Sequence, residues 1–296
     1  MTPAYTLPSR SKHQALVPGE FLLTGEDFQN IADMLHADAG IYLSEAKATL
    51  VYSRLAKRLR ALGLGNFHDY CTFVASEDGA DERQKMLAAL TTNVTRFFRE
   101  PHHFDHLKEQ LLPLVEEAKR GRRIRFWSAG CSSGQEPYSI ALSILSLLPD
   151  AAALDIRILA TDIDPHMIAD GRRGIYSDSA IADVPAELRK RYFVGTSDKG
   201  SKSVSDELRS LVAFRELNLN GAAWPMKGPF NAIFCRNVVI YFEELTQQKI
   251  WSRFAPLLVP GGCLYVGHSE RVSGLATSSF RSEGITTYRL QGRAHK

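Results

Sequence analysis

One short stretch, residues 126–136 (FWSAGCSSGQE), constrains the fold of this chain more than any other. An apolar run at 124–127 leads into a turn of small residues and then a helical pattern, and a second apolar run at 156–160 leads to Asp162. Small residues let the backbone approach a ligand closely, and parallel sheets bind ligands beyond the carboxyl ends of their strands. The pattern therefore predicts a βαβ unit that binds a nucleoside.

The glycines of this turn narrow the class of ligand. Only Gly130 and Gly134 are present, so the G-x-G-x-x-G spacing of a pyrophosphate-binding turn is not met. A nucleoside cofactor without phosphates fits better, and S-adenosylmethionine is such a cofactor. We expect the Asp162 carboxylate to accept the ribose hydroxyls, the alternative being that this acid only forms a turn. Asp164 is expected to cap the next helix, and Glu136 either caps its own helix or binds the ligand.

The composition indicates a globular protein, with 44% hydrophobic and 23% charged residues. The chain has no apolar run of about 18 residues, so no membrane span is expected. Residues 1–23 lack an apolar signal core and are expected to form a flexible tail. The four cysteines are scattered, without the spacing of a disulfide or metal site, so we expect no metal and a reduced, cytoplasmic protein.

The periodicity of the apolar residues divides the rest of the chain. Residues 24–90 show helical spacing only, with a capping box at Thr24 and Asp27, and predict an all-α N-terminal domain. Residues 91–120 are expected to be a linker and a connecting helix. Residues 121–296 are expected to form an α/β domain. Its apolar runs, which alternate with helical patterns as buried parallel strands do, lie at 124–127, 156–160, 230–235 and 263–267.

Two stretches of the α/β region depart from this alternation. Residues 190–213 have β-rich ends around a polar centre, which predicts a small antiparallel β insertion. Residues 284–290 predict an antiparallel edge strand.

Two further segments carry polar residues in positions that suit a ligand. Segment 91–100 joins the two predicted domains, where clefts often form, and its alternative is a linker with a hydrophobic plug. Arg236 and Asn237 interrupt an apolar run at the expected end of a strand, where they cost free energy unless hydrogen-bonded. A ligand is one such partner. Tyr241 follows closely, with a buried core tyrosine as its alternative.

A His/Ser/Glu catalytic set at residues 268–270 is not expected. The chain contains no G-x-S-x-G turn of the kind that presents a nucleophilic serine.

Five blocks of sequence together resemble the chemotaxis receptor glutamate O-methyltransferases, the CheR family. They are 91–100 (TTNVTRFFRE), 134–140 (GQEPYSI), 160–164 (ATDID), 234–242 (FCRNVVIYF) and 267–270 (GHSE). The resemblance runs from about residue 24 to the end of the chain. It implies a class I S-adenosylmethionine-dependent methyltransferase (Rossmann-like) domain with a small antiparallel β insertion, preceded by an all-α N-terminal domain.

The resemblance also implies an activity and assigns residues to it. The activity is methyl transfer from S-adenosylmethionine to glutamate side chains of chemoreceptor cytoplasmic domains in chemotaxis adaptation, with S-adenosylhomocysteine as product. Arg99 and Tyr241 are expected nearest the transferred methyl group. The residues expected to bind the cofactor are Asn93, Thr95, Arg99, Glu136, Asp162, Asn218, Leu219, Arg236 and Asn237.

This chain departs from the family pattern at one position and leaves one partner open. The family often has two acids after the glycine, whereas Gln135 takes the first place here and leaves Glu136. In part of the family the β insertion holds a pentapeptide at the receptor C-terminus. For the short, polar insertion of this chain, such a peptide is an open expectation.

A basic helix is the expected contact with the receptor. Residues 47–60 carry five cations and no acid. At 100° per residue, Lys47, Arg54 and Arg58 fall within about 40° of one another, with Lys57 at the edge of the stripe. With the resemblance, this stripe predicts contact with an acidic receptor bundle, and its alternative is an ordinary solvated face. We expect a monomer.

Two other functions are alternatives, a nucleic-acid methyltransferase and a non-catalytic cofactor sensor or adaptor. The basic helix favours a nucleic-acid methyltransferase, but residues 1–90 hold 9 Lys and Arg against 11 Asp and Glu, and the net charge of the chain is only +3. We therefore expect no nucleic-acid partner. A non-catalytic cofactor sensor or adaptor would lack polar groups near the methyl group, whereas Arg99 and Tyr241 are present.

Overall fold

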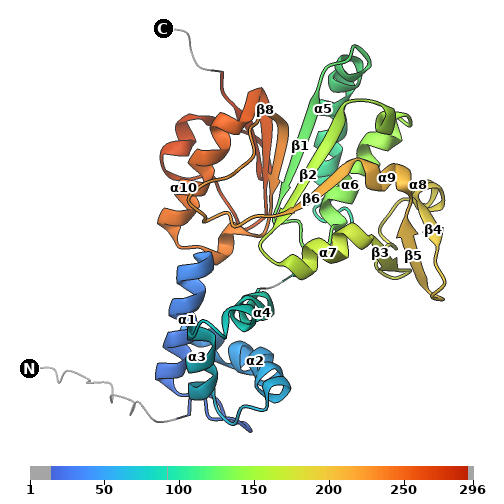
Figure 1. The fold of residues 1–296 in the computed structure, drawn as a ribbon. Helices are drawn as coiled ribbons and strands as arrows, with labels where there is room; N and C mark the ends of the chain where they lie inside the picture. The colour runs from blue at the N-terminus through green and yellow to red at the C-terminus, as the bar shows by residue number, and fades with distance from the viewer. Residues whose placement is uncertain (1–14, 92, 293–296) are drawn as a thin grey trace, which may run out of the picture. The chain divides into compact units, whose positions relative to one another are not determined.

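The computed structural model describes residues 15–91 and 93–292. It divides the chain into two compact units, residues 1–92 and 93–296 (Figure 1). No helix in the described ranges is both long and apolar enough to cross a membrane.

The first unit is all α, as the spacing of its apolar residues predicts. Thr24 accepts a hydrogen bond from the N–H of Asp27, and the Thr24 N–H donates to Asp27 Oδ2 at 3.0 Å, which confirms the capping box. Gly40 and Gly63 end the first two helices at φ of 73° and 70°, values that glycine adopts at little cost. The helices are α1 (Gly25–Ala39), α2 (Ala48–Leu62), α3 (Phe67–Ala75) and α4 (Ala80–Leu90), with a 3-10 turn η1 (Glu45–Lys47).

The second unit is built on a seven-stranded sheet in the order β6-β2-β1-β7-β8-β10-β9. The first five strands of that order are parallel, and β10 pairs antiparallel with both β8 and β9. The expected edge strand at 284–290 is therefore an inner strand, β10, and β9 is the edge. The strands are β1 (Ile124–Ala129), β2 (Ile156–Asp162), β6 (Val212–Glu216), β7 (Phe230–Cys235), β8 (Leu258–Val266), β9 (Phe280–Gly284) and β10 (Thr287–Leu290).

Helices cover both faces of this sheet (Figure 1). Phe126 of β1 belongs to the core that α5 and α6 share, whereas the next residue, Trp127, packs against Phe254 of α10 on the other face. Because both faces of the sheet are covered, β1 carries large apolar residues on successive positions, Phe126 and Trp127, and not only on alternate ones. The helices are α5 (Pro101–Lys119), α6 (Gln135–Leu147), α7 (Pro165–Arg173), α8 (Ala186–Tyr192), α9 (Asp206–Ser210) and α10 (Glu244–Phe254). Short 3-10 turns are η2 (Ala151–Ala153), η3 (Val239–Tyr241), η4 (Ala255–Leu257) and η5 (Gly274–Ser278).

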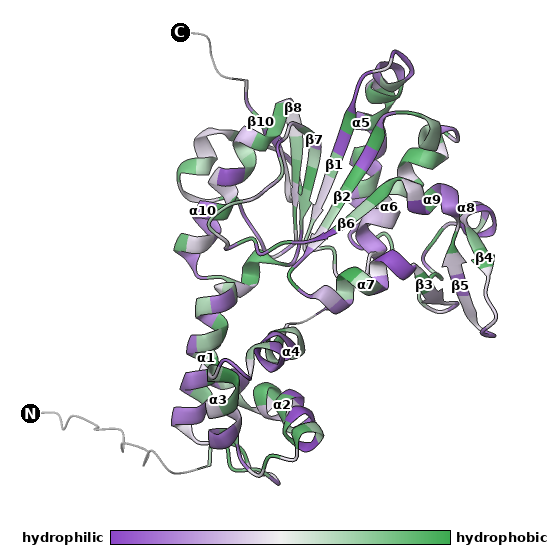
Figure 2. Ribbon diagram, in the orientation of Figure 1, coloured by the Kyte–Doolittle hydropathy of each residue, from purple (hydrophilic) through white to green (hydrophobic). Residues whose placement is uncertain are grey.

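Helix α5, which the sequence suggested as a connecting helix, is part of the second unit. Its residues Phe104, Leu107 and Leu111 are buried in the same core as β1 and α6. Figure 2 shows the hydrophobic and hydrophilic bands that such helices carry along their length. The amphipathic stripe was visible in the sequence, but the partner that buries it was not.

The predicted insertion is real, but its boundaries at 190–213 were wrong. A separate three-stranded sheet has the order β3-β5-β4, made by β3 (Ile175–Ser177), β5 (Ser201–Val204) and β4 (Phe193–Gly195). Residues 212–214 of the β-rich end belong instead to β6, which pairs in parallel with β2 through Ile158 and Val212. The sequence did not predict strand β3, because three residues are too few to show the alternation of apolar and polar residues that marks a strand.

Candidate functional site

The carboxyl ends of β1, β2, β6 and β7 lie at one edge of the sheet, and their loops carry most of the predicted residues. The turn after β1 depends on Gly130, which has a φ of 84°. A Cβ atom there would lie 2.2 Å from Val238 Cγ2, so only glycine lets this turn pass the loop that follows β7. The turn ends at Gly134, whose φ of 97° starts helix α6.

Asp162 stands buried at the end of β2, where the sequence placed it. Its Oδ2 accepts the N–H of Ser132 at 2.8 Å, and its Oδ1 accepts the N–H of Asp164 at 3.0 Å. Burial raises the pKa of Asp162, and these hydrogen bonds oppose the rise. Each oxygen keeps a further lone pair that a ribose hydroxyl could use.

The structure brings Asn93 to the same loops. The side-chain amide of Asn93 donates a hydrogen bond to Asp164 Oδ2 at 3.0 Å. The backbone carbonyl of Asn93 accepts a hydrogen bond from the Ser132 hydroxyl at 3.0 Å. Asp164 also accepts the N–H of His166 at 2.8 Å, so its predicted role as a helix cap is confirmed. Ser132, with a φ of 49°, was not predicted, and its only signal was its place between the two glycines.

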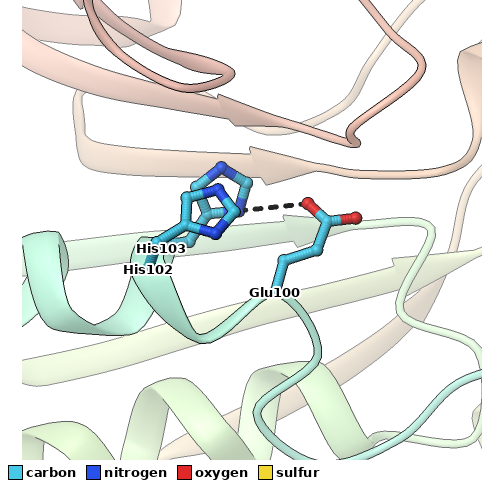
Figure 3. Close-up of side chains that lie close together, drawn as sticks. All are labelled: Glu100, His102 and His103. Atoms are coloured by element: carbon cyan, nitrogen blue, oxygen red, sulfur yellow. Dashed lines mark ion pairs between the residues drawn. The ribbon is translucent and has the colours of Figure 1, made fainter.

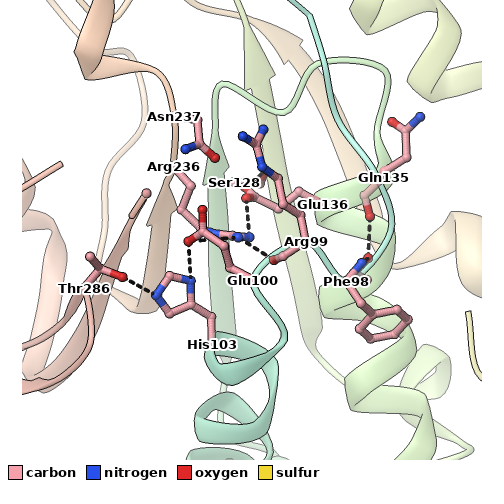
Figure 4. Close-up of polar contacts among 12 residues, drawn as sticks. Phe98, Arg99, Glu100, His103, Ser128, Gln135, Glu136, Arg236, Asn237 and Thr286 are labelled. Carbon is pink, nitrogen blue, oxygen red and sulfur yellow. Dashed lines mark hydrogen bonds and ion pairs between the residues drawn. The ribbon is translucent and has the colours of Figure 1, made fainter. Parts of the chain in front are cut away.

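Arg236 forms the centre of a second network, shown in Figure 4. Its side chain is buried, and Nη1 donates to Glu136 Oε2 at 3.1 Å, while Nη2 lies 3.4 Å from Glu100 Oε2 and also donates to the Arg99 carbonyl. Glu136 Oε1 accepts the hydroxyl of Ser128 at 2.7 Å. Both terminal nitrogens of Arg236 therefore have protein partners, whereas its buried Nε has no hydrogen-bond partner among the described residues.

The two carboxylates of this network respond differently to their surroundings. Burial raises the pKa of Glu136, and the charge of Arg236 opposes the rise. Burial alone would also raise the pKa of Glu100, but the charge of Arg236, together with hydrogen bonding from His268, outweighs burial and lowers that pKa. Glu100 has a φ of 57°, an uncommon conformation at a residue that was not among the predicted site residues.

Glu100, His102 and His103 bring three potential metal-ligating atoms within 4.8 Å of one another (Figure 3). His103 Nδ1 lies 3.5 Å from Glu100 Oε2, and burial lowers the pKa of His103 to about 3, so this ring is neutral at pH 7. Arg236 already faces the same carboxylate oxygen at 3.4 Å. Its fixed positive charge would repel a divalent cation, so we assign no metal to this cluster.

The remaining predicted residues lie on the same loops. Arg99 is half-buried and its Nη1 donates to the Val94 carbonyl at 3.0 Å. Asn218 and the buried Leu219 follow β6, where the N–H of Leu217 donates to the Asp162 carbonyl at 2.9 Å. Thr95 lies in the segment that also carries Asn93 and Arg99, and Tyr241 closes the 3-10 turn η3 after Asn237.

A turn of small residues after β1 and a buried acid after β2 are the parts of a nucleoside site in a Rossmann-like methyltransferase that uses S-adenosylmethionine. Residues 93–289 match the family model "CheR methyltransferase, SAM binding domain", and residues 26–91 match "CheR methyltransferase, all-alpha domain". The chain belongs to the CheR methyltransferase family. The predicted family, fold class and cofactor are thereby confirmed.

Several curated proteins are similar over nearly their whole length. A probable chemotaxis protein methyltransferase of Rhizobium etli is 56% identical over 86% of this chain and 96% of its own. Chemotaxis protein methyltransferase 2 of Pseudomonas aeruginosa is 44% identical over 91% of this chain and 94% of its own. The chemotaxis protein methyltransferase of Escherichia coli K12 is 41% identical over 90% of this chain and 92% of its own.

Proposed function

We propose that this chain is a protein-glutamate O-methyltransferase that methylates chemoreceptor cytoplasmic domains, and that it acts in the cytoplasm. The observation that supports a carboxylate acceptor is the charge of Arg99. Arg236 is paired with two carboxylates, whereas Arg99 makes no ion pair with any carboxylate of the described residues. A half-buried cation without a protein counter-ion favours an anionic substrate.

Methyl transfer to a carboxylate requires few catalytic groups from the protein. A glutamate carboxylate, with a pKa of about 4.3, is ionised at neutral pH, so the acceptor needs no general base. When bound, S-adenosylmethionine supplies a methyl group on a sulfonium leaving group. The residues of this chain then have to exclude water and align the acceptor. In the proposal Arg99 orients the carboxylate, and the hydroxyl of Tyr241 donates a hydrogen bond to it.

The residues around Asp162 and Arg236 would hold the cofactor. Asp162 would accept ribose hydroxyls, since its two oxygens are fixed by backbone N–H groups and retain lone pairs. The Glu136–Arg236 ion pair would remain intact when the cofactor binds and would form one wall of its site, because breaking a buried ion pair is costly. The proposed cofactor residues are Asn93, Thr95, Arg99, Glu136, Asp162, Asn218, Leu219, Arg236 and Asn237.

The basic stripe, formed by Lys47, Arg54, Lys57 and Arg58, is the proposed receptor contact, and two of its arginines have partners in their own unit. Arg58 donates to both carboxylate oxygens of Glu82 at 2.8 and 2.6 Å. Arg54 donates to the carbonyls at the end of α4, with the shortest distance, 2.7 Å, to Thr91. Both arginines therefore stabilise their own unit, and Lys57 is the exposed cation of the stripe. We propose Lys57 as a receptor contact.

The small sheet is the proposed place for a receptor C-terminal peptide. Its outer strands β3 and β4 each pair with β5 only, and they expose Ile175 and Val194, each at 50%. An edge strand with exposed apolar side chains suits an extended peptide, which can add as a further strand. The tip between β4 and β5 is exposed.

Transfer of a radiolabelled methyl group to a receptor cytoplasmic fragment tests the proposed activity. We expect label that mild base releases as methanol, as from a carboxyl methyl ester, and none on nucleic acid. Tyr241→Phe should lower kcat by about 10- to 150-fold, because it removes one hydrogen bond to a charged group, and leave cofactor affinity nearly unchanged. Tyr288→Phe, in β10, is the matched control. Label that resists base, or full activity of Tyr241→Phe, would contradict the proposal.

A further inference from the structure

A set of backbone N–H groups converges on one buried carboxylate beside the proposed site. The side chain belongs to Glu270, which is 2% exposed and follows β8. Its Oε2 accepts from Gly267 at 2.6 Å and Asn237 at 2.8 Å. Its Oε1 accepts from Val238 at 2.8 Å, Val239 at 2.9 Å and Ile240 at 3.3 Å.

The loop that this carboxylate holds is unusual in its backbone. Asn237 has a φ of 58°, and successive N–H groups that follow such a residue form a concave nest that attracts anions. Conformations of this kind persist only where the surroundings determine them. In this chain Glu270 provides the anion, and its own N–H donates to the Gly267 carbonyl at 2.8 Å, which closes the turn that carries it.

Gly267 is the second part of the arrangement. A Cβ atom at this position would lie 2.5 Å from Asn237 Nδ2, 2.7 Å from Asn237 N and 2.8 Å from Glu270 Oε2. Any side chain at position 267 would push both Asn237 and Glu270 away from this loop. The glycine is required here because the Asn237 backbone and the side chains of Asn237 and Glu270 occupy the space that a Cβ atom would fill.

We propose that Gly267 and Glu270 form a clamp that positions Asn237 and Tyr241 for cofactor binding and methyl transfer. The clamp is defined by Gly267, Glu270 and the N–H groups of residues 237–240. The Glu270 carboxylate already occupies the N–H groups of residues 237–240, so these groups cannot bind a carboxylate of the substrate or cofactor. Such a carboxylate needs another positive group, and Arg99 is the proposed one. Glu270 is thus a positioning residue, and this role rests on the proposed function of Asn237 and Tyr241.

Glu270→Gln is the sharpest variant, since it preserves size and removes one acceptor. In either orientation of the new amide, its NH2 group faces at least two backbone N–H donors, which lose their acceptor. If the remaining oxygen still accepts from the N–H groups of Val238, Val239 and Ile240, the N–H of Asn237 loses its acceptor. Gly267→Ala disturbs the same contact but retains the Glu270 carboxylate group, and it is the second variant if Glu270→Gln fails to fold.

The test combines amide hydrogen exchange with calorimetry of S-adenosylhomocysteine binding to the full-length protein. Both variants should speed exchange in residues 237–240 and weaken S-adenosylhomocysteine binding by about tenfold or more. The matched control is Glu82→Gln, which removes a buried carboxylate bound by Arg58 and Tyr70 in the first unit. It should lower thermal stability yet change that affinity by less than about twofold.

The possible outcomes separate the clamp from the proposed reaction. Unchanged exchange at 237–240 in both variants would overturn the clamp. Faster exchange with unchanged affinity and unchanged kcat would overturn its positioning role. Because S-adenosylhomocysteine binding needs no methyl acceptor, the clamp can be upheld even if receptor glutamates prove not to be the substrate.

Discussion

Two arginines in the site carry the same charge and have different surroundings. Arg236 is buried between Glu100 and Glu136 and also lies over the Phe104 ring at 5.7 Å. Arg99 is half-buried, and in the described part of the chain it has only a carbonyl partner. Partners rather than residue type therefore separate a structural arginine from one available to a substrate.

At this scale the first prediction concerns Arg236→Met. The substitution leaves two largely buried carboxylates, Glu100 at 13% and Glu136 at 12% exposed, without this cation. We expect the free energy of unfolding to fall by about 3–5 kcal/mol. The three tryptophans, Trp127, Trp224 and Trp251, all belong to the second unit, so denaturant unfolding followed by tryptophan fluorescence reports on that unit.

Arg289→Met is the control for Arg236→Met, because Arg289 pairs with Glu283 at the surface, where both side chains are about one quarter exposed. Its loss should cost about 1 kcal/mol or less. Equal effects of the two substitutions would contradict the importance given to the Arg236 network.

At the scale of elements, helix α2 shows that the cations of one stripe can have different surroundings. Arg54 supplies positive charge at the carboxyl end of α4, where the helix dipole is negative, and Arg58 neutralises the buried Glu82. Lys57, on the same helix, is exposed. A stripe that looks uniform in sequence thus contains two arginines with protein partners and one exposed lysine.

The prediction at this scale compares Lys57→Glu with Arg58→Glu. Lys57→Glu should lower receptor methylation severalfold at low salt and much less at physiological salt, because exposed charges act on encounter and are screened beyond about 8 Å. Thermal stability should not change. Arg58→Glu should instead destabilise the first unit through like charge beside Glu82. Equal methylation by Lys57→Glu and wild type at low ionic strength would leave α2 without a role in recognition.

At the scale of the whole molecule, the division into two units assigns cofactor binding to one of them. All nine proposed cofactor residues have numbers between 93 and 237, and the large core that supports their loops is formed by residues of the same unit. The two family matches, 26–91 and 93–289, divide the chain at the same place.

We therefore expect a fragment of residues 93–296 to bind S-adenosylhomocysteine with an affinity within about threefold of that of the full chain, since a domain with its own core folds independently. The same fragment should methylate receptor fragments more slowly, because it lacks α2. Calorimetry and the methyl-transfer assay measure the two properties separately. A folded fragment that binds the cofactor more than about tenfold weaker would show that residues 1–92 contribute to the site.

The sequence by itself determined the features that depend on near neighbours. The capping box of Thr24 and Asp27, the cap at Asp164 and the buried strands β1 and β2 each depend on residues a few positions apart, and the motif blocks identified the family. Short-range hydrogen bonds and side-chain periodicity carry that information directly.

Only the tertiary structure decided which distant groups meet. It placed β6 beside β2 and so removed residues 212 and 213 from the predicted insertion. It buried α5 in the second core and gave Arg236 protein partners at Glu100 and Glu136. It also brought Glu270 onto the N–H groups that begin at Asn237, 33 positions away. A buried polar group must find a partner, but its own neighbours in sequence do not say which one, because packing of the whole chain decides what comes within hydrogen-bonding distance.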